Sequence, residues 1–363
     1  MEYMQLGDIA TYINGYAFKP IDRGNEGLPI IRIQDLTGNA YDLGYYNGQY
    51  PEKIEINDGD ILISWSGSLG VYVWNGGKAL LNQHIFKVVF DKVDINQQYF
   101  VYAVRYKLDE MIGKTHGATM KHIVKKDFDT TLIPYPNIKE QEEIAIKLDK
   151  IERIIRDRKQ EIDLLDDLIR ARFVEMFGDP VANNFGWRQE RLKGVTSKIG
   201  SGATPRGGKE SYQAEGITLI RSMNVHDGRF EYKDLAHITD NQAAQLDNAT
   251  VEKGDVFINI TGASVARSCI VPDNTLPARV NQHVAIIRCV HSKLLPVFAN
   301  NMFLNSNFKD QLLSIGESGG ATRQAITKQQ LENLTVILPP LKLQEQISAF
   351  VTEVNKSKVV HYI

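Results

Sequence analysis

Residues 56–70 read INDGDILISWSGSLG, and residues 251–265 read VEKGDVFINITGASV. In both stretches a Gly-Asp turn enters an apolar run, which then gives way to small and polar residues. The two stretches lie 195 positions apart. Similarity at a fixed separation is the signature of an internal repeat. This pair therefore predicts that the chain contains two copies of one module.

Three further pairs occur in the same order along the chain. They are PIIRIQDL (29–36) with TLIRSMNV (218–225), NQH (82–84) with NQH (281–283), and GATMKHIVKKDF (117–128) with GATRQAITKQQL (320–331). Their separations grow from 189 to 199 to 203 residues, as insertions in loops would produce. We predict a tandem duplication with modules at 1–137 and 179–340, and helical segments at 138–178 and 341–363.

Each copy has short apolar or alternating segments separated by turn signals such as NDGD and NGG, which is typical of strands. The strands predicted in the first copy are Pro29–Ile33, Asp60–Ser64 and His84–Val89. A helix is predicted over Asn96–Ile112, with a counterpart over Val297–Ser314. No GxGxxG follows a strand and no GxxxxGK[ST] occurs, which argues against a doubly wound nucleotide fold. The predicted fold class is α+β, with two tandem duplicated β-rich domains separated by long coiled-coil helices.

The segment between the copies has the periodicity of a long helix. No Gly or Pro occurs from Ile138 to Phe177, and apolar residues recur in steps of four and three, with Arg158 and Arg172 interrupting the series. A continuous helix of 40 residues would be about 60 Å long. Gly178 and Pro180 are suited to end it.

A second, shorter heptad series follows the second copy and is predicted to lie antiparallel to the first. It has room for at most 22 residues before Ile363, so half of the first helix lacks a cover from this helix. Either globular side chains cover that half, or it is a docking seam for another subunit, which is the reading we favour. The predicted partner-binding residues are Ile144, Leu148, Ile151, Ile155, Ile162, Leu165, Ile169, Phe173, Leu343, Ile347, Phe350 and Val354.

The bulk composition of the 363 residues is that of a globular protein, with a net charge of −2. No run approaches the roughly 18 apolar residues of a membrane span, and the N-terminus does not resemble a signal peptide. The only cysteines, Cys269 and Cys289, form neither a disulfide framework nor a CxxC zinc motif. These features predict a cytoplasmic protein without membrane contact.

Charge is nevertheless segregated along the chain. Three stretches contain no acidic residue: 111–126, 195–209 and 274–309. Basic, acid-free loops in a nearly neutral protein are one way to build a local phosphate-binding face, although they also arise by chance on protein surfaces.

The repeated histidines, His84 and His283, are the natural candidates for catalysis. A catalytic role would need a nucleophile, a carboxylate or metal ligands at matching places in both copies. Asp60 and Asp255 are doubled, but an Asx turn at each Gly-Asp explains them. No HExxH, GxSxG or paired-carboxylate motif occurs. We predict a scaffold role for NQH, with phosphate contact as the alternative, and no catalytic or metal-binding residue.

If the two copies bind related but unequal targets, the residues that read the target should differ between them. Three pairs of loops diverge: 14–19 with 200–209, 64–70 with 259–265, and 114–121 with 317–324. They carry small residues that allow close approach, together with side chains suited to phosphates and base edges. The predicted DNA-binding residues are Asn14, Tyr16, Lys19, Ser66, Ser68, Lys114, His116, Lys121, Ser201, Thr204, Arg206, Lys209, Thr261, Ser264, Arg267 and Arg323.

Taken in order, these motifs resemble the specificity subunit of type I restriction-modification systems. The resemblance covers essentially the whole chain. It rests on INGYAFKP, GDILISWSGSLG, LNQHIFKV, SGGATRQAI, LPPLKLQEQI and especially RARFVEMFGDP at 170–180. One departure is clear: no second RARFVEMFGDP follows, so the second helical region is predicted to be shorter than the first.

The resemblance implies a division of labour. Each module would be a target recognition domain that grips one half of a bipartite site on double-stranded DNA. The helices would set the distance between the half-sites and dock modification subunits, expected to be two. Those methyltransferase partners would bind S-adenosylmethionine and methylate adenine, and restriction subunits would join through the complex. The chain itself would hold no cofactor and would not be an enzyme.

The rival hypothesis is a tandem β-rich protein- or glycan-binding module on a coiled-coil stalk. Basic, acid-free loops argue against a glycan site, and Trp65 and Trp74 have no tryptophan counterparts in the second copy. A steep fall of DNA affinity with salt would separate the two hypotheses. Alanine at Arg206, Lys209 and Arg323 together should affect the second half-site only.

Overall fold

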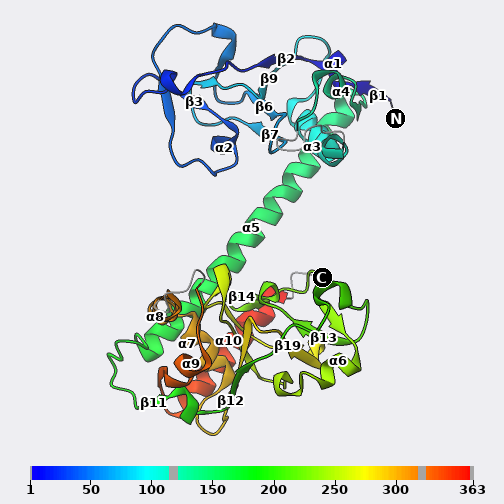
Figure 1. The fold of residues 1–363 in the computed structure, drawn as a ribbon. Helices are drawn as coiled ribbons and strands as arrows, with labels where there is room; N and C mark the ends of the chain where they lie inside the picture. Colours follow the sequence, from blue (N-terminus) through cyan, green and yellow to red (C-terminus); the bar gives the residue numbers. More distant parts are fainter. Residues whose placement is uncertain (1, 114–121, 318–323, 360–363) are drawn as a thin grey trace. The chain divides into compact units, whose positions relative to one another are not determined.

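A computed structural model describes residues 2–113, 122–317 and 324–359, and the chain divides into two units, residues 1–157 and 158–363. We call them the first and second domain and describe each by itself (Figure 1). Helix α5 (Ile138–Phe177) begins in the first domain and ends in the second. The predicted α+β class is confirmed, because each domain combines small sheets with helices.

The first domain is built on two four-stranded sheets. One has the strand order β2-β9-β6-β7 and the other β4-β3-β8-β5, while β1 pairs with β10. The strands are β1 Tyr3–Gln5, β2 Thr11–Asn14, β3 Leu28–Ile31, β4 Gly44–Tyr46, β5 Glu55–Ile56, β6 Ile61–Ser64, β7 Gly70–Val73, β8 Ala79–Leu81, β9 Ile85–Val89 and β10 Leu132–Pro134. The helices are α1 Leu6–Ile9, α2 Ile33–Leu36, α3 Gln97–Gly113 and α4 Lys125–Asp129.

The second domain repeats this topology. Its sheets have the orders β12-β20-β17-β18 and β16-β13-β19, β11 pairs with β21, and β14 pairs with β15. The strands are β11 Gln189–Arg191, β12 Thr196–Ser201, β13 Ile217–Ile220, β14 Val225–His226, β15 Arg229–Phe230, β16 Ala236–Ile238, β17 Val256–Asn259, β18 Ser268–Ile270, β19 Ala278–Val280, β20 Val284–Cys289 and β21 Thr335–Ile337. The helices are α6 Asp240–Ala244, α7 Pro296–Leu304, α8 Ser306–Glu317, α9 Lys328–Asn333 and α10 Leu341–Val359.

Strand pairing shows that the duplication is structural. In the first domain β3 pairs in parallel with β8, and Ile31 lies opposite Leu81. In the second domain β13 pairs in parallel with β19, and Ile220 lies opposite Val280. Parallel pairs need long crossover connections, so the same pair in both domains is strong evidence for one ancestral module.

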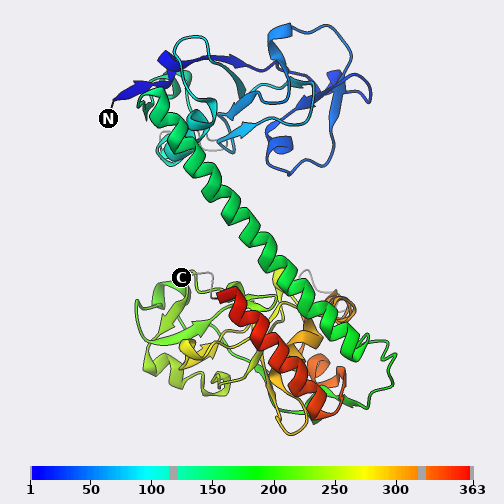
Figure 2. The ribbon, with the colours of Figure 1, turned by 180° about the vertical axis from the view of Figure 1, so that it is seen from behind.

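Each domain also has two hydrophobic cores, one for each larger sheet. In the second domain the β12-β20-β17-β18 core includes Phe173 and Phe177 of α5 together with Ile347 and Val351 of α10. Figure 2 shows α10 antiparallel to the C-terminal half of α5, and Lys358 Nζ lies 2.6 Å from Asp166 Oδ1. The antiparallel arrangement predicted for the two helices is thus confirmed within this domain.

One helix prediction is wrong. A single helix was predicted over Val297–Ser314, but the chain forms α7 and α8 with Asn305 extended between them. The Asn305 side-chain oxygen accepts hydrogen bonds from the backbone N–H groups of Asn307 (3.1 Å) and Phe308 (3.3 Å). These bonds cap a new helix start, which explains the break without Gly or Pro.

The starts of α5 and α10 are fixed by two fully buried glutamines that occupy equivalent positions. Gln141 accepts the N–H of Asn96 (2.9 Å) and donates to the carbonyl of Pro136 (2.8 Å). Gln344 accepts the N–H of Leu295 (2.9 Å) and donates to the carbonyl of Pro339 (2.9 Å). The sequence analysis did not single them out, although both stand at the same place in KEQEEI and KLQEQI.

Candidate nucleic-acid interface

The two NQH turns occupy equivalent places, between β8 and β9 and between β19 and β20. The carbonyl of His84 accepts the N–H of Trp65 (3.1 Å), and the carbonyl of Trp65 accepts the N–H of Ile123 (3.0 Å). In the second domain His283, Ile260 and Ile326 repeat these bonds at 2.9 and 2.8 Å. Each turn therefore ties the loop after β6 or β17 to the segment that leads into α4 or α9.

The loops after β2 and β12 approach the same turns through a glycine. A Cβ on Gly15 would lie 2.0 Å from the carbonyl oxygen of Asn82, and one on Gly202 would lie 1.8 Å from that of Val280. No other residue fits such a close approach of two backbones. The first two pairs of divergent loops thus lie beside an NQH turn.

In the second domain a chain of side chains links these loops. Thr204 Oγ1 hydrogen-bonds Gln282 Oε1, and Gln282 Nε2 lies 3.1 Å from His283 Nε2. His283 Nδ1 in turn contacts Thr261 Oγ1. The next residue, Gly262, donates its N–H to the carbonyl of Gln324 (3.0 Å), beside the third loop.

The first domain joins its loops with different side chains. Trp65 Nε1 donates to Asn14 Oδ1 (3.1 Å), and the Trp65 ring meets the His84 ring at a centroid distance of 4.9 Å. His84 has a φ of 73°, in the left-handed region, and its buried Nδ1 has no hydrogen-bond partner among the described residues. Ser66 bridges to His122 on the far side of the turn.

The predicted DNA-binding residues differ in accessibility. Ser66 is only 2% exposed and bridges to His122, so its side chain offers little surface for the predicted DNA contact. Lys114, His116, Lys121 and Arg323 lie outside the described residues. Asn14, Tyr16, Lys19, Ser68, Thr204, Arg206 and Lys209 are exposed, and Ser201, Thr261, Ser264 and Arg267 are half-buried.

The acid-free stretches are less uniformly basic in three dimensions than in sequence. Within 274–309, Arg279 pairs with Asp247, Arg288 with Asp255, and Lys309 with Asp227. Acidic partners from elsewhere in the chain therefore offset most of the positive charge of this stretch. Arg206 and Lys209 differ, because neither makes an ion pair with any residue the structure describes.

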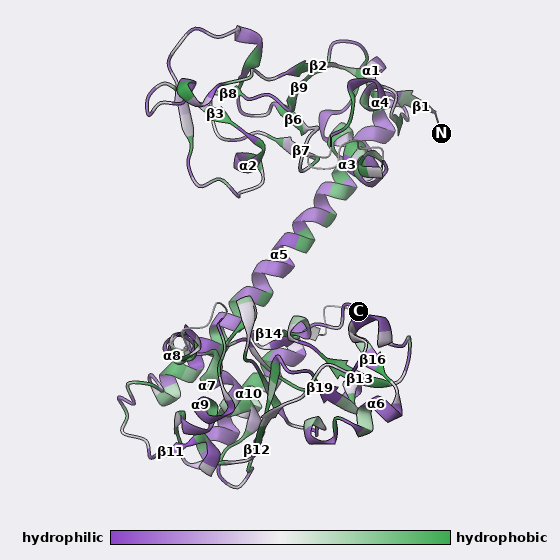
Figure 3. Cartoon of the chain, viewed as in Figure 1, coloured by the Kyte–Doolittle hydropathy of each residue, from purple (hydrophilic) through white to green (hydrophobic). Residues whose placement is uncertain are grey.

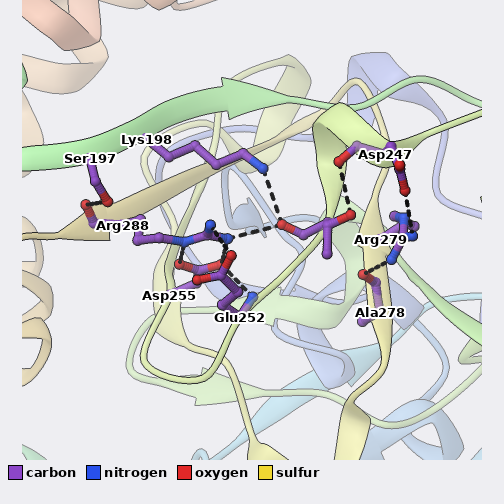
Figure 4. A network of polar contacts seen from close by, with 9 residues as sticks. Ser197, Lys198, Asp247, Glu252, Asp255, Ala278, Arg279 and Arg288 are labelled. Carbon is purple, nitrogen blue, oxygen red and sulfur yellow. Dashed lines mark hydrogen bonds and ion pairs between the residues drawn. The ribbon is translucent and has the colours of Figure 1, made fainter.

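Figure 4 shows the network around Arg288, which is a scaffold. The Arg288 guanidinium binds the fully buried Asp255 at 2.8 Å, which raises the pKa of Arg288 above its ordinary value. Burial, reinforced by the charge of Arg288, lowers the pKa of Lys198. The counterpart of this pair in the first domain is Lys87 with Asp60, at 2.8 Å.

The turns at the two Gly-Asp sites differ from the predicted Asx turns, in which the carboxylate would accept the N–H two residues ahead; here each carboxylate accepts the N–H three residues behind it. Asp60 Oδ2 accepts the N–H of Asn57 (2.8 Å), and Asp255 Oδ2 accepts that of Glu252 (2.7 Å). Within the described residues, no group of three or more His, Cys, Asp or Glu side chains is placed to hold a metal ion. The doubled polar residues thus stabilise turns and sheets.

Comparison with known families decides what these two domains are. A family model for the type I restriction modification DNA specificity domain matches residues 1–164 and 184–359. The chain belongs to this family. It is a type I restriction-modification specificity subunit, in which two tandem domains recognise DNA sequence.

Curated relatives span most of the chain. The EcoBI specificity subunit of Escherichia coli is 25% identical over 95% of this chain and 77% of its own length. The MjaVIII specificity subunit of Methanocaldococcus jannaschii is 21% identical over 96% of this chain and 84% of its own length. Both relatives are named as specificity subunits of type I restriction enzymes.

Solved structures share the fold. The S subunit of a type I system from M. genitalium aligns with a TM-score of 0.56 and 14% identity, covering 98% of this chain and 90% of its own. A chain from a study of complex assembly in the type I system aligns with a TM-score of 0.51 and 17% identity, covering 99% and 91%. None of the helices in the described part of the chain is long and apolar enough to cross a membrane.

The helices of the specificity subunit expose only part of the predicted docking seam. Ile151 and Ile155 are 51% and 50% exposed, as is the neighbouring Ile154 at 53%. Figure 3 shows the alternation of apolar and polar residues along α5. Four residues of the predicted seam are buried in the second domain's own core, so their side chains are not accessible to a partner: Ile169, Phe173, Ile347 and Val354. Ile144, Leu148, Ile162, Leu165, Leu343 and Phe350 are partly buried.

Proposed function

We propose that each domain of this specificity subunit reads one half of a bipartite site on double-stranded DNA, through the loops that converge on its NQH turn. The observation that carries the proposal is the contrast between shared and divergent residues. The turns, the Asp–cation pairs and the parallel strand pairs are common to both domains, whereas the loops beside the turns differ. A common scaffold with different loops is what recognition of two unequal sequences requires.

Individual roles follow from exposure and charge. Arg206 and Lys209 are exposed cations suited to phosphate contacts that set the register of the second domain. In the first domain Lys19 has that role, and Asn14 and Tyr16 lie beside it on the same loop. Asn and Thr side chains can address base edges in the major groove.

Methyltransferase subunits, two in the complete complex, dock on the exposed seam of α5 around Ile151, Ile154 and Ile155. Exposed apolar residues at heptad spacing on one helix favour a helical partner. S-adenosylmethionine binds in those partners, which methylate adenine, and restriction subunits join through the complex. The specificity subunit itself catalyses nothing and holds no cofactor. It acts in the cytoplasm, where its DNA substrate is found.

The deciding experiment combines co-purification of the chain with its modification subunits and mapping of methylated adenine on genomic DNA. A motif of two short half-sites with a fixed gap is expected. Stable assembly with only one specified half-site would contradict reading by both domains. The stalked protein- or glycan-binding module, which the family match does not favour, predicts neither assembly nor a motif.

The docking seam is tested in the same assay with Ile151→Glu and Ile155→Glu, which should abolish co-purification without unfolding the chain, since both side chains are half exposed. Ile146→Glu is the matched control, because Ile146 is 67% exposed on the same helix but lies outside the heptad seam. Equal loss of binding in the control would contradict docking on the seam.

A further inference from the structure

We propose that Gln282 is a positioning residue that determines sequence specificity at the second half-site. Together with His283 it locks two reading loops of the second domain to each other. This inference rests on the proposed function, because it assigns a mechanism to loops that are proposed to read DNA. It also revises the scaffold role predicted for NQH, since the same tripeptide does different work in the two domains.

Gln282 is exposed, but both ends of its side-chain amide are held by hydrogen bonds. Its side-chain oxygen accepts a hydrogen bond from the hydroxyl of Thr204, in the loop after β12. Its side-chain nitrogen lies 3.1 Å from His283 Nε2. An exposed glutamine normally keeps its rotamer freedom, and fixing it costs conformational entropy. A side chain held by two hydrogen bonds therefore transmits the position of the NQH turn to the Thr204 loop.

The direction of these hydrogen bonds follows from their donor and acceptor groups. An amide nitrogen can only donate, so His283 Nε2 is the acceptor, and the neutral imidazole carries its proton on Nδ1. That proton is donated to Thr261 Oγ1. Within the part of the chain that the structure describes, the Thr261 hydroxyl hydrogen then has no acceptor. The chain from Thr204 to Thr261 thus leaves a hydrogen-bond donor for an acceptor on DNA, such as a purine N7 or a phosphate oxygen.

The first domain serves as the comparison. There the backbone N–H of Gln83 donates to Asn82 Oδ1 (2.8 Å), but its side chain makes no hydrogen bond with the described residues. Asn14 and Trp65 join the corresponding loops instead, at 3.1 Å. Among the described residues the glutamine links loops in the second domain and not in the first, so Gln83 is a matched control within the same chain.

The test maps methylated adenine with the assembled complex, in which the first half-site is an internal reference. Gln282→Ala and the near-isosteric Thr204→Val should each reduce discrimination at the second half-site by roughly tenfold, the effect of one hydrogen-bonded contact. The first half-site should be unchanged. Thr204→Ser, which keeps the hydroxyl, should retain wild-type specificity at the second half-site. Gln83→Ala should alter the specificity of neither half-site.

The double variant Thr204→Val/Gln282→Ala separates a network from independent contacts. Coupled residues should lose no more together than either loses alone. Fully additive losses, or an unchanged second half-site in Gln282→Ala, would overturn the positioning role. Both substituted side chains are exposed, so unfolding is not expected, and an unchanged melting temperature checks this. A wild-type complex that methylates no bipartite motif would contradict the proposed function itself. That outcome differs from an unchanged second half-site in Gln282→Ala, which would contradict only the positioning role.

Discussion

At the scale of single residues, the buried glutamines show how a polar side chain can fix the start of a helix. Gln344 is fully buried and satisfies three backbone groups: the N–H of Leu295 (2.9 Å) and the carbonyls of Pro339 (2.9 Å) and Lys293 (3.1 Å). The bond to Pro339 is buried and the other two are partly buried, so each of these backbone groups would be costly to leave without a partner. The glutamine therefore joins the start of α10 to the start of α7.

Gln344→Ala should destabilise the second domain by about 3 kcal/mol, since it leaves buried backbone groups unpaired and opens a cavity. The measurement is the free energy of unfolding from urea denaturation. Gln346→Ala, on the exposed face of the same helix, is the matched control and should change the free energy of unfolding little. Similar effects of the two substitutions would argue against the capping role.

The two cysteines give a prediction for pH. Burial raises the pKa of both Cys269 and Cys289 to about 12, whereas the pKa of a thiol in the unfolded chain is about 8.5. The unfolded state therefore loses protons first as pH rises. The stability contributed by each thiol is fully present below about pH 8.5 and declines from there toward pH 12.

Thiol labelling at pH 8 checks the same assignment. Both thiols should resist labelling in the folded protein and react in urea, because the thiolate is the reactive form and both sulfurs are buried. Rapid labelling of the native chain would contradict it. A Cys289→Ser variant reports Cys269 alone.

At the scale of elements, the sequence predicts structure well where local rules decide the outcome. Helix α5 extends from Ile138 to Phe177, as predicted, because nothing interrupts it before Gly178. Gly178 has a φ of 72°, and its N–H donates to the carbonyl of Val174 (2.8 Å), which is a left-handed helix end. The break at Asn305 was missed because it depends on a side-chain cap that helical periodicity does not reveal.

Gly178→Ala should destabilise the protein by about 1–2 kcal/mol, because an L side chain is strained at positive φ and its Cβ would lie 3.3 Å from the Phe185 ring. Calorimetry of the two variants checks this. Gly200→Ala is the control, since no atom lies within 4 Å of its added Cβ. A smaller loss at Gly178 than at Gly200 would contradict the left-handed cap.

The candidate interface was predicted only in part, for a related reason. The divergent loops could be located because the duplication supplies its own comparison. The link from Thr204 to Gln282 could not, because it joins residues 78 positions apart through side chains that only the folded β12-β20 pair brings together. The ion pairs of Arg279 and Arg288 were hidden for the same reason, since their acidic partners lie far away in sequence.

At the scale of the whole molecule, duplication gives two binding domains to a chain whose net charge is only −2. Positive and negative charges nearly balance, so electrostatic attraction to DNA is weak for a single domain. Because both domains belong to one chain, binding of one raises the effective concentration of the other. Partner subunits would add further DNA contacts and so raise the modest DNA affinity of the isolated chain.

The isolated chain should therefore bind DNA only modestly at physiological salt, and the modification subunits should tighten binding. The measurement is the dissociation constant by fluorescence anisotropy across a salt series, with and without those subunits. Arg206→Ala/Lys209→Ala should lower the slope of log K against log salt by about 2, one for each lost phosphate contact. Lys342→Ala, an exposed lysine at the start of α10, should leave the slope unchanged. Nanomolar binding by the isolated chain would contradict the dependence on partners, because affinity would then reside in the two domains themselves.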